Sequence, residues 1–152
     1  MNACLACEVN EGRLPAPGGV ILDTGRWVVD HTIGTLGLGT IIVKPRRHVL
    51  RVGELDSEEA AELGPLLRRV AAAVDAVAQP SQVYISLWSH QDRVPGHVHF
   101  VVQPVSEALM AELDAHGPKL QAALFDRAQP VDEERAAEFA ARVRALLAVA
   151  DS

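Results

Sequence analysis

Two histidines separated by a single residue, His97 and His99, lie in an apolar run that is typical of a β-strand. We expect this strand to extend from His97 to Gln103 and to end at Pro104. Because side chains alternate along a strand, one face turns outward, and it carries His97, His99, Val101 and Gln103. Near neutral pH an imidazole can act as a nucleophile, a proton acceptor or a metal ligand. The pair therefore predicts a functional site, although two solvated strand histidines are the alternative.

Two cysteines near the start of the sequence, Cys4 and Cys7, have the spacing Cys-x-x-Cys. In a reducing compartment this spacing indicates metal binding or redox chemistry rather than a structural disulfide. Zn²⁺ prefers four tetrahedral ligands drawn from cysteine and histidine, so this pair would need two histidines from elsewhere in the chain. A frayed, unliganded terminus is the alternative.

The segments that must position these residues are short strands and one long helix. β-Branched and apolar runs predict strands over 20–22, 27–30, 40–43 and 83–88, ahead of the histidine strand. Asp56 and Glu59 form a capping-box pattern, and apolar residues at helical spacing continue from there to residue 77. Pro65 predicts either a kink in this helix or a helix that begins near residue 64.

Beyond Pro104 the sequence becomes rich in Ala, Leu, Glu and Arg, which predicts helices over 105–125 and 131–150. We therefore expect an α+β fold in which an antiparallel sheet packs on one main helix. Residues 1–105 would form the part that carries the chemistry. Residues 106–152 would form a C-terminal helical extension of the same domain.

Composition limits the classes of partner. The chain has 152 residues, 49% of them hydrophobic, which fits one domain with a substantial core. Its formal net charge of -6 argues against a nucleic-acid polymer as partner, because phosphate backbones favour basic faces. The sequence has no run of about 18 or more apolar residues that would predict a membrane span. Its first residues lack the pattern of a secretory signal, so we expect a cytoplasmic protein.

Several of these stretches, taken together, resemble the histidine triad (HIT) superfamily, whose motif is His-φ-His-φ-His-φ-φ with φ apolar. The resemblance rests on Gly96–Val102, Val43–Val49, Leu55–Leu63 and the cysteine pair, which occur in the order seen in the family. The cysteine pair is similar to that of the zinc-bearing branch. The resemblance implies a HIT-like α+β fold and a homodimer formed through the sheet. It also implies a nucleotide-binding hydrolase or nucleotidyltransferase that acts at the α-phosphate of a nucleoside phosphate conjugate.

The resemblance further implies roles for individual residues. His99 matches the nucleophile, which would form a nucleotidyl-imidazole intermediate while a backbone carbonyl in the same strand fixes its tautomer. Asp30 matches an acidic residue that bonds the ribose hydroxyls; an aspartate that only ends a strand is the alternative. The implied metal is one structural Zn²⁺, and its ligands would be Cys4, Cys7, His48 and His97.

One position departs from the motif, because Val101 stands where the family has a third histidine or, in its uridylyltransferase-like branch, a glutamine. That residue normally bonds the phosphate or the leaving group, which valine cannot do. Neighbouring polar groups could bind the nucleotide in its place, and the candidates are Ser89, His90, Arg93 and Gln103. A basic cluster could also attract phosphate, although we favour a solvated turn for it; it consists of Lys44, Arg46 and Arg47.

Three functions are compatible with these residues. The leading one is a zinc-bearing HIT nucleotide hydrolase or nucleotidyltransferase. The second is a zinc-stabilised nucleotide-binding module with little or no catalysis, because its third triad residue is Val101. The third is a scaffold whose C-terminal helices recruit a partner. Turnover that is abolished by His99→Ala would separate the first function from the other two.

Overall fold

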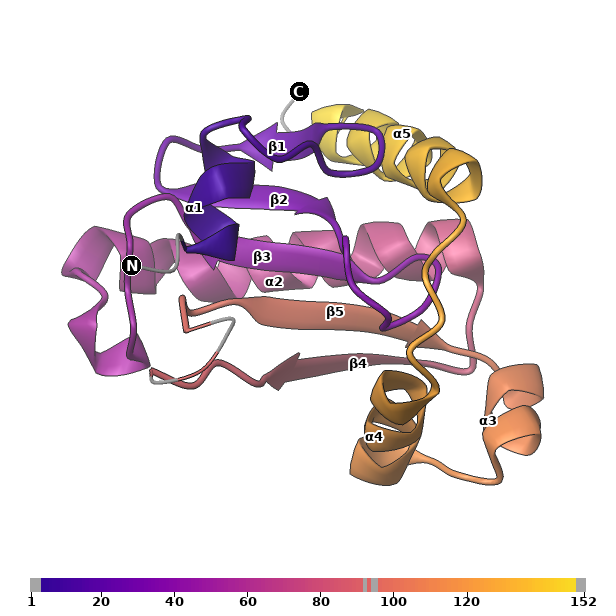
Figure 1. Cartoon of the computed structure of the whole chain (residues 1–152). Coiled ribbons are helices and arrows are strands. Elements are labelled where there is room, and N and C mark those ends of the chain that lie inside the picture. Colours follow the sequence, from indigo (N-terminus) through magenta and orange to yellow (C-terminus); the bar gives the residue numbers. More distant parts are fainter. Residues whose placement is uncertain (1–3, 92, 94–95, 150–152) are drawn as a thin grey trace.

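Strands from distant parts of the sequence meet in one antiparallel sheet. In the computed structural model, which describes residues 4–91, 93 and 96–149, five strands pair in the order β1-β2-β3-β5-β4 (Figure 1). Their bounds are Val20–Asp23 (β1), Trp27–His31 (β2), Ile41–Pro45 (β3), Gln82–Leu87 (β4) and Phe100–Val105 (β5). All neighbouring pairs are antiparallel, so the predicted α+β class is confirmed. Each predicted strand is present, although its ends differ from the prediction.

Helix α2 (Ser57–Ala78) begins where the capping box predicts. The Asp56 carboxylate accepts bonds from the backbone N–H groups of Glu58 and Glu59, and the Glu59 carboxylate accepts one from Asp56 N. Pro65 lies inside the helix on its exposed side, where the carbonyl that loses its partner stays open to water. A helix start near residue 64 is therefore wrong, and a kink at Pro65 stays a prediction.

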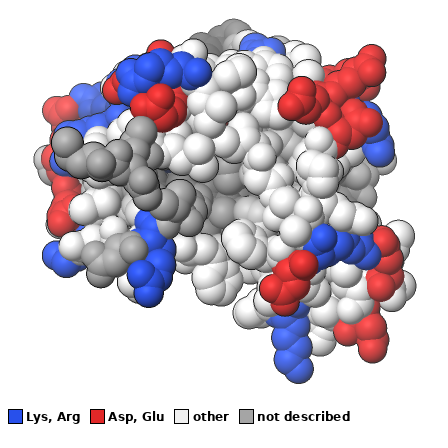
Figure 2. Space-filling view, viewed as in Figure 1, with Lys and Arg blue, Asp and Glu red and all other residues white. Residues whose placement is uncertain are grey.

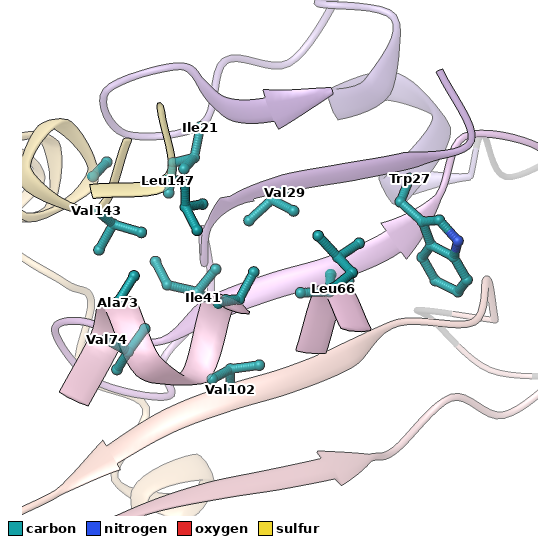
Figure 3. Packing of buried hydrophobic residues seen from close by; sticks show 13 residues of the cluster. Ile21, Trp27, Val29, Ile41, Leu66, Ala73, Val74, Val102, Val143 and Leu147 are labelled. Atoms are coloured by element: carbon teal, nitrogen blue, oxygen red, sulfur yellow. The ribbon is translucent and has the colours of Figure 1, made fainter. Parts of the chain in front are cut away.

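The hydrophobic core lies between one face of the sheet and two helices. Alternate residues of the strands point into it and meet α2 and the C-terminal helix α5 (Glu133–Val149). Figure 3 labels Trp27, Val29, Ile41 and Val102 of the strands and Leu66 of α2 among the core residues. Helix α5 contributes Ala140, Val143 and Leu147 to the same cluster. The C-terminal segment therefore shares the core of the domain.

The segment after β5 forms two short helices instead of the single helix expected over 105–125. Helix α3 (Glu107–Leu113) ends at Asp114, whose backbone is left-handed with a φ of 48°. Pro118 then stands in the first turn of α4 (Gly117–Arg127). A left-handed residue followed by a proline ends one helix and starts another, so the prediction is wrong here. The helix expected over 131–150 matches α5, and residue 150 lies outside the described residues.

The other side of the sheet, here called the outer face, consists of the strand residues that alternate with the core residues, among them Asp30, Lys44, Val101 and Gln103. The N-terminal helix α1 (Leu5–Asn10) and α4 lie in front of this face in Figure 1. Leu120 and Leu124 of α4 form a small second cluster with Val105. A 3₁₀ turn, η1 (Val52–Glu54), precedes α2. None of the helices in the described part of the chain is long and apolar enough to cross a membrane.

Candidate active site and metal centre

The two histidines lie just before β5 rather than within it. The strand begins at Phe100, later than expected, and it continues past Pro104 to Val105. Val105 O accepts a bond from Ser81 N on the β4 side, which turns the nitrogen of Pro104 toward β3. The pairing between β3 and β5 has already ended at Val102. The proline therefore removes no bond between these two strands, and the prediction that it ends β5 is wrong.

Burial separates the two histidines, which were expected side by side on an exposed face. His97 is fully buried, with 0% of its surface exposed, whereas His99 is half-buried. Val101 is 1% exposed. The expected exposure is therefore wrong for His97, Val101 and Gln103, the last of which is also 1% exposed. For His97 the physical reason is that the cysteines at the start of α1 pack against its ring.

Two contacts orient His99. Its Nδ1 lies 2.8 Å from the carbonyl oxygen of His97, so this nitrogen carries the proton and donates it, and the free lone pair is on Nε2. The Ser89 hydroxyl accepts from His99 N at 3.0 Å and donates to His97 O at 3.1 Å. Burial lowers the pKa of His99, against the opposing effect of the bond to His97, and the charge of Lys44 lowers it further. The ring is therefore neutral near pH 7.

The four side chains of the implied metal set come together beside the first turn of α1. The ligand atoms of Cys4, Cys7, His48 and His97 all lie within 4.8 Å of one another. His97 Nδ1 is 3.6 Å from Cys4 Sγ and 3.7 Å from Cys7 Sγ, and His48 Nδ1 is 3.3 Å from Cys7 Sγ. In a tetrahedral zinc site with ordinary bond lengths, sulfur and nitrogen ligands stand about 3.5 Å apart. The donor set and its spacing therefore fit a Zn²⁺ ion.

Contacts around this cluster orient its ligands. His97 Nε2 donates to Pro45 O at 2.9 Å, which leaves Nδ1 to face the sulfurs. Asn10, at the end of α1, donates to the same carbonyl at 3.1 Å and ties α1 to the end of β3. Burial lowers the pKa of His97 to about 4, so the ring is in the neutral form that binds metals. Burial and the neighbouring Cys4 raise the pKa of Cys7 to about 11, and a bound cation would reverse this by favouring the thiolate.

The other residues predicted to bind nucleotide lie in different surroundings. Asp30 is buried, and its carboxylate accepts a hydrogen bond from Lys44 Nζ in an ion pair. Gln103 is also buried; its amide nitrogen donates to Leu36 O, and its oxygen accepts from Gln121 of α4. Arg93 and His90 are exposed in the loop that precedes His97. The contacts of these residues with a nucleotide stay predictions.

Lys44 is the candidate residue whose environment the sequence interpretation missed. Arg46 and Arg47 behave as the favoured basic turn, since their exposed guanidinium groups pair with Asp23 and Glu59, but Lys44 is only 2% exposed. A signal was available, because this lysine directly follows a β-branched run that predicts a buried strand. Lysine is almost never fully buried unless it is paired, so its position predicts a buried partner of opposite charge.

Comparison with known proteins identifies the fold. No protein-family model and no curated protein sequence matches the chain. A crystal structure of a Zn-bound histidine triad family protein from Mycobacterium smegmatis is 21% identical, with a TM-score of 0.69 over 98% of this chain and 96% of its own. A hypothetical histidine triad nucleotide-binding protein from Sulfolobus tokodaii is 15% identical, with a TM-score of 0.74 over 96% and 93%. A HIT-like protein involved in cell-cycle regulation from Bartonella henselae is 15% identical, with a TM-score of 0.73 over 96% and 97%.

These likenesses show that the chain has the HIT fold, here a five-stranded antiparallel sheet packed on α2 and α5. The fold expected from the sequence resemblance is confirmed. One of the similar structures is described as Zn-bound, and this chain brings a four-residue cysteine and histidine cluster together at the end of its sheet.

Proposed function

We propose that this protein is a HIT-family nucleotide hydrolase or nucleotidyltransferase in which His99 attacks the α-phosphorus of a nucleoside phosphate conjugate. The observation that carries the proposal is the 2.8 Å contact between His99 Nδ1 and His97 O, because it leaves Nε2 unprotonated on a partly exposed ring. The fold supports it, since one structure similar to this chain is named a nucleotide-binding protein.

In the proposed step, Nε2 forms a bond to phosphorus while the bond to the leaving group breaks, and the leaving group departs with the electron pair and takes up a proton. Water or a second phosphate then attacks the phosphorus of the nucleotidyl-imidazole. The N–P bond breaks and its electron pair returns to Nε2, which restores the neutral ring, and an attacking water releases a proton to the solvent. Ser89 holds the turn that carries His99. We keep Asp30, Ser89, Arg93 and Gln103 as proposed nucleotide-binding residues. Asp30 and Gln103 would have to exchange or share their present partners to contact a ligand.

We further propose that Cys4, Cys7, His48 and His97 hold a structural Zn²⁺ ion. Four protein ligands close a tetrahedral site and leave no position for a substrate. Bound there, the ion would tie α1 to the segments that flank β3 and β5. It would also hold in place the residue whose carbonyl orients His99.

One observation favours a second candidate function. Val101 is 1% exposed and has no polar group at the position where the HIT motif has its third polar residue. Loss of one donor to a developing negative charge costs roughly a hundredfold or more in rate. The second candidate is therefore a zinc-stabilised nucleotide-binding module with little or no catalysis.

The test of the enzyme is a turnover panel of nucleoside phosphoramidates, dinucleoside polyphosphates and nucleotide sugars. We expect His99→Ala to abolish turnover and His116→Ala to leave it unchanged, because His116 is an exposed histidine at the start of α4. Nucleotide binding without turnover would favour the binding module. Wild-type protein that neither binds nor turns over any member of the panel would refute both functions.

We also propose that the protein is cytoplasmic and forms a homodimer through the sheet. Strand β4 lies at one edge of the sheet, and Ile85 within it and Trp88 just beyond it are exposed. Exposed strand edges with apolar side chains are templates for pairing with a second chain. Sedimentation equilibrium tests this: Ile85→Lys should shift the wild-type dimer toward monomer, and a monomeric wild type would contradict the proposal.

A further inference from the structure

We propose that Lys44 gives the site its preference for phosphate-bearing ligands, by placing a buried positive charge on the outer face next to His99. This inference rests on the proposed function, whose phosphate subsite it describes. It concerns the place where the HIT motif has a third polar residue and this chain has Val101.

Strand pairing brings Lys44 to the side of the nucleophile. β3 and β5 are antiparallel, with Ile42 opposite Val101. The printed pairing ends with Val43 opposite Phe100, and the same register continued by one residue would set Lys44 opposite His99, just before β5 begins. Lys44 alternates with core residues of β3, so its side chain belongs to the outer face, as does that of Val101.

The positive charge of Lys44 is held in place by an ion pair with Asp30 on the neighbouring strand. The side chains of Lys44 and Asp30 are both almost fully buried, and the ammonium donates to the carboxylate. Lys44 is on β3, the strand next to β5, whereas Asp30 is on β2, one strand further from His99. The positive partner of the pair is therefore carried by the strand nearer to His99, and the negative partner by the strand further from it.

Two of the groups that were candidates to replace the third triad residue, Ser89 and Gln103, already bond other parts of the protein. The Ser89 hydroxyl bonds the backbone of His97 and His99. The Gln103 side chain bonds Leu36 O and the Gln121 side chain. Among the described residues visible on the outer side, charged side chains gather around the rim and few lie over the centre (Figure 2). The charge that competes with a phosphate for the ammonium is therefore the buried carboxylate of Asp30, with which a ligand would have to share it. Attraction between charges is stronger in apolar surroundings than in water.

The test compares nucleoside 5′-monophosphates with the matching nucleosides as ligands of the full-length protein. Lys44→Met is combined with Asp30→Asn, because Lys44→Met alone would leave a buried carboxylate unpaired. The matched control is Lys119→Met, since Lys119 is the other lysine of the sequence and lies exposed on α4. Thermal unfolding and zinc content verify that each variant is folded. If the double variant does not fold, Lys44→Gln with Asp30→Asn keeps hydrogen-bonding groups at both positions and takes its place.

The quantity measured by calorimetric titration is the ratio of the nucleoside Kd to the monophosphate Kd. We expect this ratio to be about tenfold to a hundredfold lower in the double variant than in wild type and Lys119→Met, the effect of one charged contact. If the role of Lys44 were purely structural, the double variant would bind nucleosides and monophosphates more weakly by the same factor. An unchanged ratio would thus overturn the inference and leave the proposed function standing. Wild-type protein that binds none of the monophosphates would overturn both.

Discussion

Cys7→Ser removes the sulfur that stands 3.3 Å from His48 Nδ1 and 3.7 Å from His97 Nδ1, and it should abolish zinc binding. A neutral hydroxyl is a poor replacement for a thiolate among the ligands that zinc prefers. The remaining ligands, Cys4, His48 and His97, cannot close a tetrahedral site. The variant should therefore unfold at a lower temperature than the zinc-loaded wild type.

The size of the effect follows from how the cluster is assembled. Its ligands are far apart in sequence, 41 residues from Cys7 to His48 and 93 from Cys4 to His97, so the unfolded chain does not present the complete set. Zinc then binds the folded state almost exclusively. At a free concentration a thousandfold above its Kd, such a ligand adds about 4 kcal/mol to the free energy of unfolding. In a chain of this length each kcal/mol shifts Tm by about 2–4 °C, so the expected loss is about 8–16 °C.

The assay is thermal unfolding of wild type and Cys7→Ser with and without a zinc chelator, together with metal analysis of the purified proteins. We expect one zinc per wild-type chain, none in the variant, and a Tm difference that the chelator removes. His116→Gln is the control, because it replaces an exposed histidine outside the cluster. Zinc that persists in the variant, or a wild-type Tm that is insensitive to the chelator, would refute the reasoning.

Three further outcomes are expected. Ser89→Ala removes two bonds to the histidine turn, so initial rates should fall about fivefold, the equivalent of about 1 kcal/mol, with little change in Tm. Gly18 and Gly19 share a φ of 74°, but a Cβ on Gly18 would lie 3.0 Å from the backbone of Ala137, whereas one on Gly19 meets nothing within 4 Å. Gly18→Ala should therefore lower Tm more than Gly19→Ala, which carries only the backbone cost of about 1–2 kcal/mol. Burial lowers the pKa of His31, so the unfolded chain binds a proton that the native ring does not, and stability should fall as the pH drops below about 6.5. His31→Gln should reduce this loss in Tm measurements between about pH 7 and pH 5. A part of the loss should remain, because burial also lowers the pKa values of His97 and His99.

Each of these outcomes has a contrary result. An unchanged rate in Ser89→Ala would mean that the two bonds do not position the nucleophile. Equal Tm values for the two glycine variants would mean that α5 moves aside at no cost. A pH dependence that is as steep in His31→Gln as in wild type would assign the acid sensitivity to other groups.

Local patterns in the sequence determined which elements form and which residue types could do chemistry. Asp56 and Glu59 marked the start of α2, and runs of apolar and β-branched residues marked the strands, because capping and strand propensity depend on near neighbours. The motif around His97 and His99, with the cysteine pair, was sufficient to predict the HIT fold and a four-residue metal cluster, and the structure brings all four side chains together.

Tertiary structure alone decided burial and direction. His97 is buried because α1 packs against it. Val101 is covered although it alternates with core residues, and Lys44 forms an ion pair with Asp30 on the neighbouring strand. These facts depend on contacts between segments that are far apart in the sequence, and periodicity within one segment does not encode what covers its outer face. The same holds for the tautomer of His99, which a single carbonyl in the turn before β5 sets. The sequence therefore determined which residue types form the site. Packing across the sheet decided which imidazole joins the cysteine and histidine cluster and which remains partly exposed.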